Sequence, residues 1–224
     1  MIDARLPKLP NLSPLYITLL GLAILLNAYV FLTPFLAFSD FESTLPLYDA
    51  GHLLCHQKIS RSNCIFQGAN GYYFGDCTAQ NGTYIQSDSG ILSSTKGADV
   101  GYKFPVCSRD IGIYTFLLLG LVAYPFVFDT HSLKVPNMLW FVLAIAPLGI
   151  DGTLQLAGSL GYPLPIIGFY ESTNLIRLLT GLPAGLALAI YIIPIVNNLM
   201  AFFVSESKGP FFSQKRKPLG KEKV

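Results

Sequence analysis

The chain has 224 residues, of which 52% are hydrophobic and only 12% are charged. Soluble domains carry about 25% charged residues, so this composition excludes an ordinary soluble domain and indicates one compact membrane domain. The net charge of +2 at pH 7 excludes the strongly basic balance typical of a nucleic-acid-binding protein.

Four long apolar stretches are predicted transmembrane helices, at residues 14–38, 111–128, 137–161 and 175–204. A helix of roughly 20 residues crosses a hydrocarbon core of about 30 Å, and these stretches approach or exceed that length. Asp151 interrupts the third stretch, and Arg177 lies near the start of the fourth. The first is far longer than the roughly 7–15 apolar residues of a signal peptide, which favours an uncleaved anchor. The predicted fold class is therefore all-α, a polytopic membrane protein with four transmembrane helices in one domain, residues 1–204.

The distribution of Lys and Arg predicts that both termini are cytoplasmic. In this orientation the cytoplasmic side holds Arg5, Lys8, Lys134 and a basic tail of residues 205–224. The long loop between the first two helices, residues 39–110, is then extracytoplasmic. Its own basic residues weigh little, because long loops obey the charge rule weakly. The sequence thus predicts an integral protein of the cell membrane.

The long loop carries the signs of a surface segment. Asn81 begins an Asn-Gly-Thr sequon and is a candidate N-glycosylation site. Cys64 and Cys77 enclose a stretch rich in Gly, Asn, Asp and Tyr, and are candidates for a disulfide in an oxidising compartment. We expect residues 64–104 to form a loop or a small hairpin insert. Alternating aromatic and aliphatic positions predict strand character in two short runs, 72–74 and 84–86.

A second group of Cys and His residues is a candidate metal site for zinc. If the segment around His52 is helical, His52 and His56 lie on one face with the i, i+4 spacing that lets two imidazoles bind one ion. Cys55 lies between them, and Cys107 is a further candidate because zinc takes Cys and His ligands. The alternative is a disulfide between Cys55 and Cys107, which the oxidising compartment slightly favours. No phosphate-binding loop, haem signature or nucleophile elbow occurs in the sequence.

Charged residues lie at the same end of three predicted spans. Charges against hydrocarbon are unfavourable, so such residues indicate a functional site. Asp110 begins the second span, where a carboxylate suits the positive end of the helix dipole, and Arg109 is suited to a carboxylate or an anionic headgroup. Asp151 and Gln155 are four residues apart in the third span and face the same way. A lone buried Asp needs a cation, a set of hydrogen bonds or a proton.

The fourth span opens with a polar stripe in which Glu171, Asn174 and Arg177 repeat every three residues. Arg177 is suited to pair with Asp151, Asp110 or Glu171. One interpretation is a structural ion pair between helices, and the other is an anion or proton site. Because buried ion pairs contribute little net stability, we favour the functional interpretation.

Four motifs in this order resemble a known family. They are Cys55-His56-Gln57, Cys107-x-Arg109-Asp110-x-Gly112-x-Tyr114, Asp151-Gly152-x-x-Gln155 and Glu171-Ser172-Thr173-Asn174-x-x-Arg177-x-x-Thr180-Gly181. Together they cover roughly residues 45–190, and the ordered set is similar to the multi-pass membrane proteins catalogued as domain of unknown function 2085. The resemblance implies a small polytopic membrane protein and no specific activity. It also implies that Cys55 and Cys107 are the family-type pair, whereas the insert with Cys64 and Cys77 is peculiar to this chain.

The leading functional prediction is an enzyme that acts on a lipid-borne or membrane-proximal substrate. A metal ion at the Cys and His cluster would activate water or polarise an oxygen, and the carboxylates would act as general acid or base. The candidate catalytic residues are Arg109, Asp110, Asp151, Glu171 and Arg177, with the two arginines holding a phosphate or carboxylate. We expect membrane lipid as a partner, together with other subunits of a membrane complex or a second copy of the chain.

Two other functions fit the sequence. One is a non-catalytic subunit of a larger membrane complex, in which the cysteines are disulfides and the charges tie helices together. The other is a small transporter or proton-handling protein, with Asp151, Gln155 and Arg177 as a relay.

Overall fold

A computed structural model describes residues 12–55, 58–77, 92–163, 165 and 168–207. Within these ranges, four helices are long and apolar enough to cross a membrane, which confirms the predicted spans. They are α1 (Pro14–Ser39), α3 (Ser108–Val127), α4 (Met138–Ser159) and α5 (Asn174–Ser207). Helix α3 begins three residues before the predicted span, so Arg109 and Asp110 lie in its first turn. A carboxylate is favourable there because it faces the positive end of the helix dipole.

The all-α prediction is wrong in one respect, because part of the long loop folds into an antiparallel sheet. Its four strands are β1 (Asn63–Gly68), β2 (Gly71–Asp76), β3 (Ser93–Lys96) and β4 (Asp99–Lys103), in the order β2-β1-β4-β3. Strand β2 confirms the strand predicted at 72–74, whereas residues 84–86 lie outside the described residues. The turn between β3 and β4 contains Gly97 at a φ of 67°, a conformation that glycine adopts without strain.

The sheet contains the predicted disulfide between Cys64 and Cys77, whose sulfur atoms are 2.03 Å apart. Cys64 lies in β1 and Cys77 directly follows β2, so the bond closes the β1–β2 hairpin. Both side chains pack with Phe66 and Ile59 in a small buried cluster. The hairpin therefore has a small core of its own, and a second buried cluster with Ile65 of β1, Val30 of α1 and Ile111 of α3 packs the sheet against the helices.

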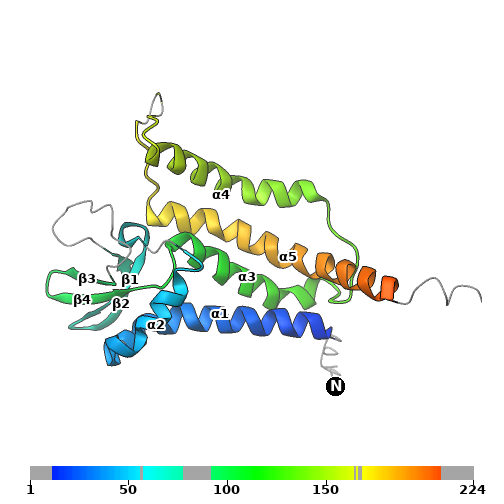
Figure 1. Cartoon of the computed structure of the whole chain (residues 1–224), viewed down its shortest axis with the longest axis horizontal. Coiled ribbons are helices and arrows are strands. Elements are labelled where there is room, and N and C mark those ends of the chain that lie inside the picture. Colours follow the sequence, from blue (N-terminus) through cyan, green and yellow to red (C-terminus); the bar gives the residue numbers. More distant parts are fainter. Residues whose placement is uncertain (1–11, 56–57, 78–91, 164, 166–167, 208–224) are drawn as a thin grey trace, which may run out of the picture.

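Helix α2 (Phe41–Gly51) connects α1 to the sheet. It begins directly after α1, at Asp40, whose side chain accepts a hydrogen bond from the Ser43 amide and so caps the helix. Figure 1 shows α2 and the sheet at one end of the helix bundle, beyond the start of α3 and α5. We call this end of the molecule the sheet end.

Glycines bring the backbones of α3 and α5 into direct contact. A Cβ atom added at Gly112, Gly181 or Gly185 would lie only 2.3–2.5 Å from a carbonyl oxygen of the other helix. No larger residue fits at such a position unless the helices move apart. This is the small-residue packing typical of membrane helices, where a close backbone approach replaces the hydrophobic driving force.

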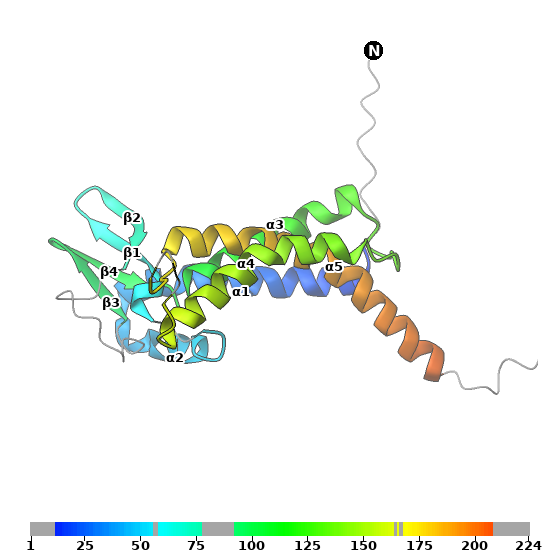
Figure 2. The same cartoon turned by 90° about the horizontal axis from the view of Figure 1, so that it is seen from above.

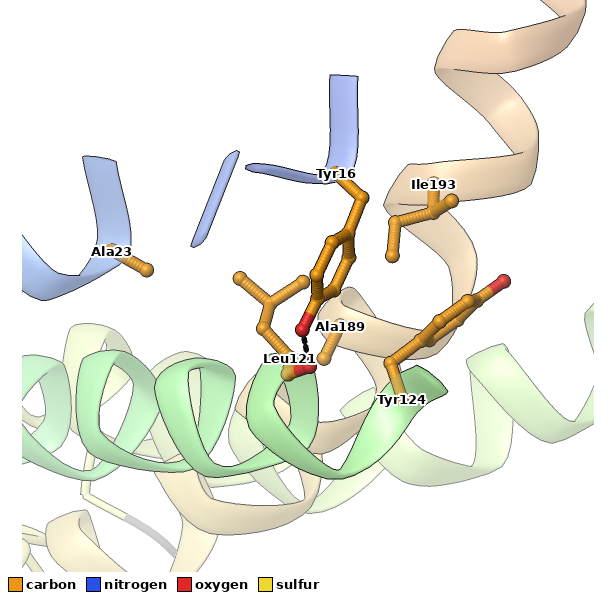
Figure 3. Packing of buried hydrophobic residues seen from close by; sticks show 6 residues of the cluster. All are labelled: Tyr16, Ala23, Leu121, Tyr124, Ala189 and Ile193. Carbon is orange, nitrogen blue, oxygen red and sulfur yellow. Dashed lines mark hydrogen bonds between the residues drawn. The ribbon is translucent and has the colours of Figure 1, made fainter. Parts of the chain in front are cut away.

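Helix α1 packs against this pair through a buried cluster far from the sheet end. Its members are Tyr16, Ala23, Leu121, Tyr124, Ala189 and Ile193, which come from α1, α3 and α5 (Figure 3). The Tyr16 hydroxyl donates a 2.9 Å hydrogen bond to the carbonyl oxygen of Leu121, drawn as the dashed line. This bond satisfies a polar group that would otherwise be buried without a partner.

Helix α4 lies at the outside of the bundle, beside α5 (Figure 1). Its only buried residues are Asp151 and Gln155, which are both polar. Its large apolar side chains, such as Trp140 and Ile150, are exposed and suit contact with hydrocarbon. Figure 2 shows that the last part of α5 runs away from the other helices. Asp151 and Gln155 lie in the last turns of α4, and Gln155 contacts Glu171 just before α5 begins. The polar side of α4 therefore lies close to the start of α5, at the sheet end.

Candidate functional site

Most of the described polar residues singled out in the sequence meet at the sheet end, around one cavity of about 160 Å³. The first turns of α3 and α5 and the last two turns of α4 supply part of its wall. The segment between α2 and β1 supplies the rest. The lining residues are Cys55, Lys58, Arg61, Cys107, Arg109, Gln155 and Arg177.

Asp151 is buried but has several partners. Arg109 forms an ion pair with its Oδ2 atom, and the Tyr170 hydroxyl donates a 2.8 Å hydrogen bond to Oδ1. The same Arg109 guanidinium lies 3.3 Å from Gln155 Oε1. Asp151 thus receives the cation and hydrogen bonds that its burial requires. Hydrogen bonding to Asp151 also raises the pKa of Tyr170, because an ionised phenol could no longer donate to the carboxylate.

Arg177 pairs with Glu171, one of the three carboxylates that the sequence proposed as its partner. The two groups are 2.9 Å apart, and the Arg177 side chain is almost fully buried. Glu171 Oε1 also accepts a 3.2 Å bond from Arg61 Nε and a 3.4 Å bond from Gln155 Nε2. Because Gln155 contacts both Glu171 and Arg109, it joins the two ion pairs into one network.

Two buried N–H donors of this network have no acceptor among the described residues. They are Arg109 Nε and Arg177 Nε. A buried donor without an acceptor is unfavourable by about 1–3 kcal/mol. Both residues line the cavity, together with Lys58 and Arg61, so four of the seven lining residues that the structure describes are cationic. The cavity offers unsatisfied donors and positive charge to an anion.

The thiols of Cys55 and Cys107 lie in the wall of the same cavity. Cys107 is the residue that precedes α3, and its thiol donates a 3.0 Å hydrogen bond to Asp110 Oδ2. Candidate ligand atoms of Cys55, Cys107 and Asp110 all lie within 4.8 Å of one another. Hydrogen bonding with Cys55, burial and the Asp110 carboxylate raise the pKa of the Cys107 thiol. The predicted pair of cysteines is therefore together in space, as two thiols beside a carboxylate.

The helical segment expected to pair His52 with His56 is absent. Helix α2 ends at Gly51, and His52 is exposed at that end. After Gly51 the chain continues as a turn over residues 52–54. Among the described residues, the compact group contains Asp110 and not His52. His56 and the sequon residue Asn81 lie outside the described residues.

Sequence reasoning gave no role in the site to Lys58, Arg61 or Tyr170. Lys58 and Arg61 belong to the basic residues of the long loop, and they follow Cys55 by three and six residues. Their closeness to the Cys55 motif was the one available signal. Tyr170 directly precedes the Glu171 motif, but no sequence rule connects it to Asp151. The fold brings these residues to the cavity through contacts that are distant in sequence.

A family model described as "Predicted membrane protein (DUF2085)" matches residues 100–191. The match includes Cys107 and the ion pairs Arg109–Asp151 and Arg177–Glu171. The chain is 30% identical over 177 residues to an uncharacterized protein of Methanocaldococcus jannaschii, covering 76% of this chain and 85% of that protein. It is 37% identical over 96 residues to an uncharacterized protein of Methanothermobacter thermautotrophicus, covering 40% of this chain and 70% of that protein.

No solved structure matches the chain significantly. The relative from Methanocaldococcus jannaschii aligns over most of both chains, and the family model matches residues 100–191. The match also agrees with the four ordered motifs and with the four helices that can cross a membrane. The chain therefore belongs to the DUF2085 family of predicted membrane proteins.

Proposed function

We propose that this protein binds the phosphate group of a membrane-borne molecule in the cavity at the sheet end. One observation carries the proposal. The guanidinium Nε atoms of Arg109 and Arg177 are buried without an acceptor in a cavity lined by four cationic side chains. A phosphate oxygen is an acceptor that suits both donors, because arginine and phosphate form strong charge-assisted hydrogen bonds.

The charge balance favours a phosphate. Lys58, Arg61, Arg109 and Arg177 line the cavity. Two carboxylates, Asp151 and Glu171, pair with three of these cations. Four cations against two carboxylates leave an excess of two positive charges, or of one when Asp110 is counted. A phosphate monoester carries about −1.5 to −2 charges at pH 7, which matches this excess better than a single carboxylate does.

The size and position of the cavity favour a ligand held in the membrane. Its volume of about 160 Å³ is smaller than the roughly 300–1,000 Å³ of typical small-molecule pockets, so it suits a phosphate group and not a whole substrate. The remainder of the ligand must extend outside the cavity. Helix α4, which closes one side, faces hydrocarbon with its apolar residues. A phosphate group in the cavity lies at the depth of the bilayer headgroups. The acyl chains of a lipid that carries this phosphate can therefore lie beside α4.

We place the sheet end on the extracytoplasmic side as part of the same proposal. The distribution of Lys and Arg supports this orientation, since Lys134 lies in the turn at the opposite end. The disulfide between Cys64 and Cys77 supports it as well, because disulfides persist in oxidising compartments.

The test compares two short-chain lipids that differ only in the phosphate, phosphatidic acid and diacylglycerol. Binding to the detergent-purified protein is measured by isothermal titration calorimetry in low and high salt. We expect phosphatidic acid to bind, diacylglycerol not to bind, and the affinity to fall as salt screens the cavity charges. Equal binding of the two lipids contradicts the proposal. Competition by inorganic phosphate at the same concentration would indicate a soluble phosphate ligand instead.

Lys58 offers the cleanest variant, because it lines the cavity and forms no ion pair with another described residue. We expect Lys58→Gln to weaken phosphatidic acid binding about tenfold, equivalent to roughly 1.4 kcal/mol. The matched control is Lys134→Gln, at the exposed turn of the opposite end, which leaves the affinity unchanged. Equal losses in both variants would assign the effect to net charge and not to the cavity.

A further inference from the structure

We propose that Cys55, Cys107 and Asp110 form a site for a zinc-type divalent metal ion in the wall of the phosphate cavity. The metal site follows from these three side chains alone. Only the identity of its fourth ligand rests on the proposed function. The two parts are therefore tested separately below.

The separation of the three ligand atoms suits a tetrahedral ion. The candidate atoms of Cys55, Cys107 and Asp110 lie within 4.8 Å of one another, and Cys107 Sγ is 3.0 Å from Asp110 Oδ2. With Zn–S of about 2.3 Å and Zn–O of about 2.1 Å, neighbouring ligands of a tetrahedral zinc ion are roughly 3.6–3.8 Å apart. Side-chain shifts of about 1 Å or less convert one arrangement into the other.

The backbone holds two of these ligands in a fixed relation. Cys107 precedes α3, and Asp110 lies three residues later in its first turn, so both side chains share one face of the helix. Close packing of Gly112 against Leu178 fixes this turn against α5. The Ser108 hydroxyl donates a 3.1 Å hydrogen bond to the Arg61 carbonyl, which ties the segment after Cys55 to the same turn. The third ligand is thus held close to the other two.

The chemistry of the group favours a metal over a disulfide. Thiolate and carboxylate are both zinc ligands. A disulfide between Cys55 and Cys107 would use both sulfur atoms and would leave the Asp110 carboxylate without its thiol donor. Two thiolates, one carboxylate and a divalent cation add up to one negative charge. The arginine and lysine side chains around the cavity can accommodate that charge.

The three ligands among the described residues leave one position open, as in catalytic zinc sites. Cys55 and Cys107 both line the cavity, so the open position faces it. Water or an oxygen of the bound phosphate can take this position. The metal ion would then contact the phosphate from one side, while Arg109 and Arg177 donate hydrogen bonds from the other. This places the site in the class that binds phosphate esters with a metal ion and arginines together.

The experiment titrates the reduced, metal-stripped protein with Co²⁺ and follows its absorption spectrum. We expect uptake of about one ion per chain, with a thiolate-to-cobalt charge-transfer band and the strong visible bands of tetrahedral coordination. Zinc should displace the cobalt, because it prefers the same geometry. Absence of the charge-transfer band in the reduced wild-type protein overturns the proposal.

Variants of the proposed ligands test whether the charge-transfer band arises from Cys55, Cys107 and Asp110. Cys107→Ser should abolish the charge-transfer band or weaken cobalt affinity by more than about 100-fold, beyond the effect of losing a supporting residue. Asp110→Asn should keep the band and lower the affinity about tenfold or more. The matched control, Asp129→Asn, replaces an exposed carboxylate at the opposite end and should change neither. Size-exclusion chromatography confirms that each variant is folded, and an unchanged spectrum in folded Cys107→Ser excludes the site.

The same samples separate this inference from the proposed function. If the protein binds phosphatidic acid through Lys58 but takes up no cobalt, the metal site is excluded and the phosphate site is retained. Cobalt binding without phosphatidic acid binding retains the metal site and removes the phosphate ligand. If phosphate takes the open position, phosphatidic acid should shift the visible cobalt bands, and diacylglycerol should not.

Discussion

Helix α5 contacts α3 and α4 in physically different ways. Against α3, the backbones touch at Gly112, Gly181 and Gly185, so the two helices pack closely through small residues. Against α4, the buried contacts come from polar residues. Asp151 and Gln155 are the only buried side chains of α4. Asp151 pairs with Arg109 of α3. Gln155 contacts Glu171, which pairs with Arg177 of α5.

The difference follows from the solvent. Hydrocarbon accommodates an apolar side chain as well as a protein interior does, so burial of apolar surface gives membrane helices little reason to associate. Two other kinds of contact hold these helices together. Small residues pack closely between α3 and α5, and polar side chains pair between α4 and its neighbours. Close packing leaves no room for a ligand. Polar pairing creates a cavity with donors and charges, and this is where the candidate site lies.

The largest expected effect is that of breaking the close contact. In Gly181→Leu, the new side chain meets the Arg109 carbonyl oxygen, which lies 2.4 Å from the ideal Cβ position. We expect a loss of about 3 kcal/mol or more in stability, or no folded protein at all, because backbone cannot yield as a side chain does. Thermal unfolding in detergent measures the effect. Gly149→Ala, with no atom within 4 Å of the added Cβ, is the control and should remain folded.

The next effect is that of breaking the polar attachment. Asp151→Ala leaves the Arg109 charge without its partner in a largely buried position, and we expect a loss of about 3 kcal/mol. The double variant Arg109→Met with Asp151→Ala should recover part of this loss, since no unpaired charge is left. A double-mutant cycle on unfolding free energies measures the coupling. Additive effects of the two single changes would show that the pair does not hold α4.

The smallest effect concerns the attachment of α4 far from the site. The buried Tyr191 hydroxyl of α5 donates a 2.6 Å hydrogen bond to the carbonyl oxygen of Asn137, at the start of α4. We expect Tyr191→Phe to reduce stability by about 1 kcal/mol and to leave phosphatidic acid binding unchanged. Reduced lipid binding in this variant would mean that the cavity depends on the position of the whole helix and not only on its polar end.

The transmembrane helices could be predicted from the sequence because their signal is local. A long uncharged run has one stable structure in hydrocarbon, the helix. The helices at residues 14–38 and 111–128 can therefore be predicted without knowledge of tertiary contacts. The sheet was predicted only in part, because β3 is the polar run Ser93–Lys96, which shows no apolar alternation. Only its pairing with β4, which in turn pairs with β1, makes it a strand.

The site was found only in part for the same reason. Asp151 and Arg177 stood out because charges are rare in apolar helices, but their partners depend on how the helices pack. The pairing of Asp151 with Arg109, 42 residues away, follows from the rotation of α4 about its axis, which hydropathy does not reveal. The helical spacing expected for His52 and His56 has no support in the structure, because α2 ends at Gly51, and His56 lies outside the described residues.

The most direct test of the central claim is a crystal structure grown in a lipidic phase that contains phosphatidic acid. The account predicts a phosphate group in the cavity, with oxygens within hydrogen-bond distance of Arg109 Nε and Arg177 Nε. Both buried donors would then have the acceptor that they lack among the described residues. A cavity that holds only water, with phosphatidic acid bound elsewhere on the bundle, would contradict the account.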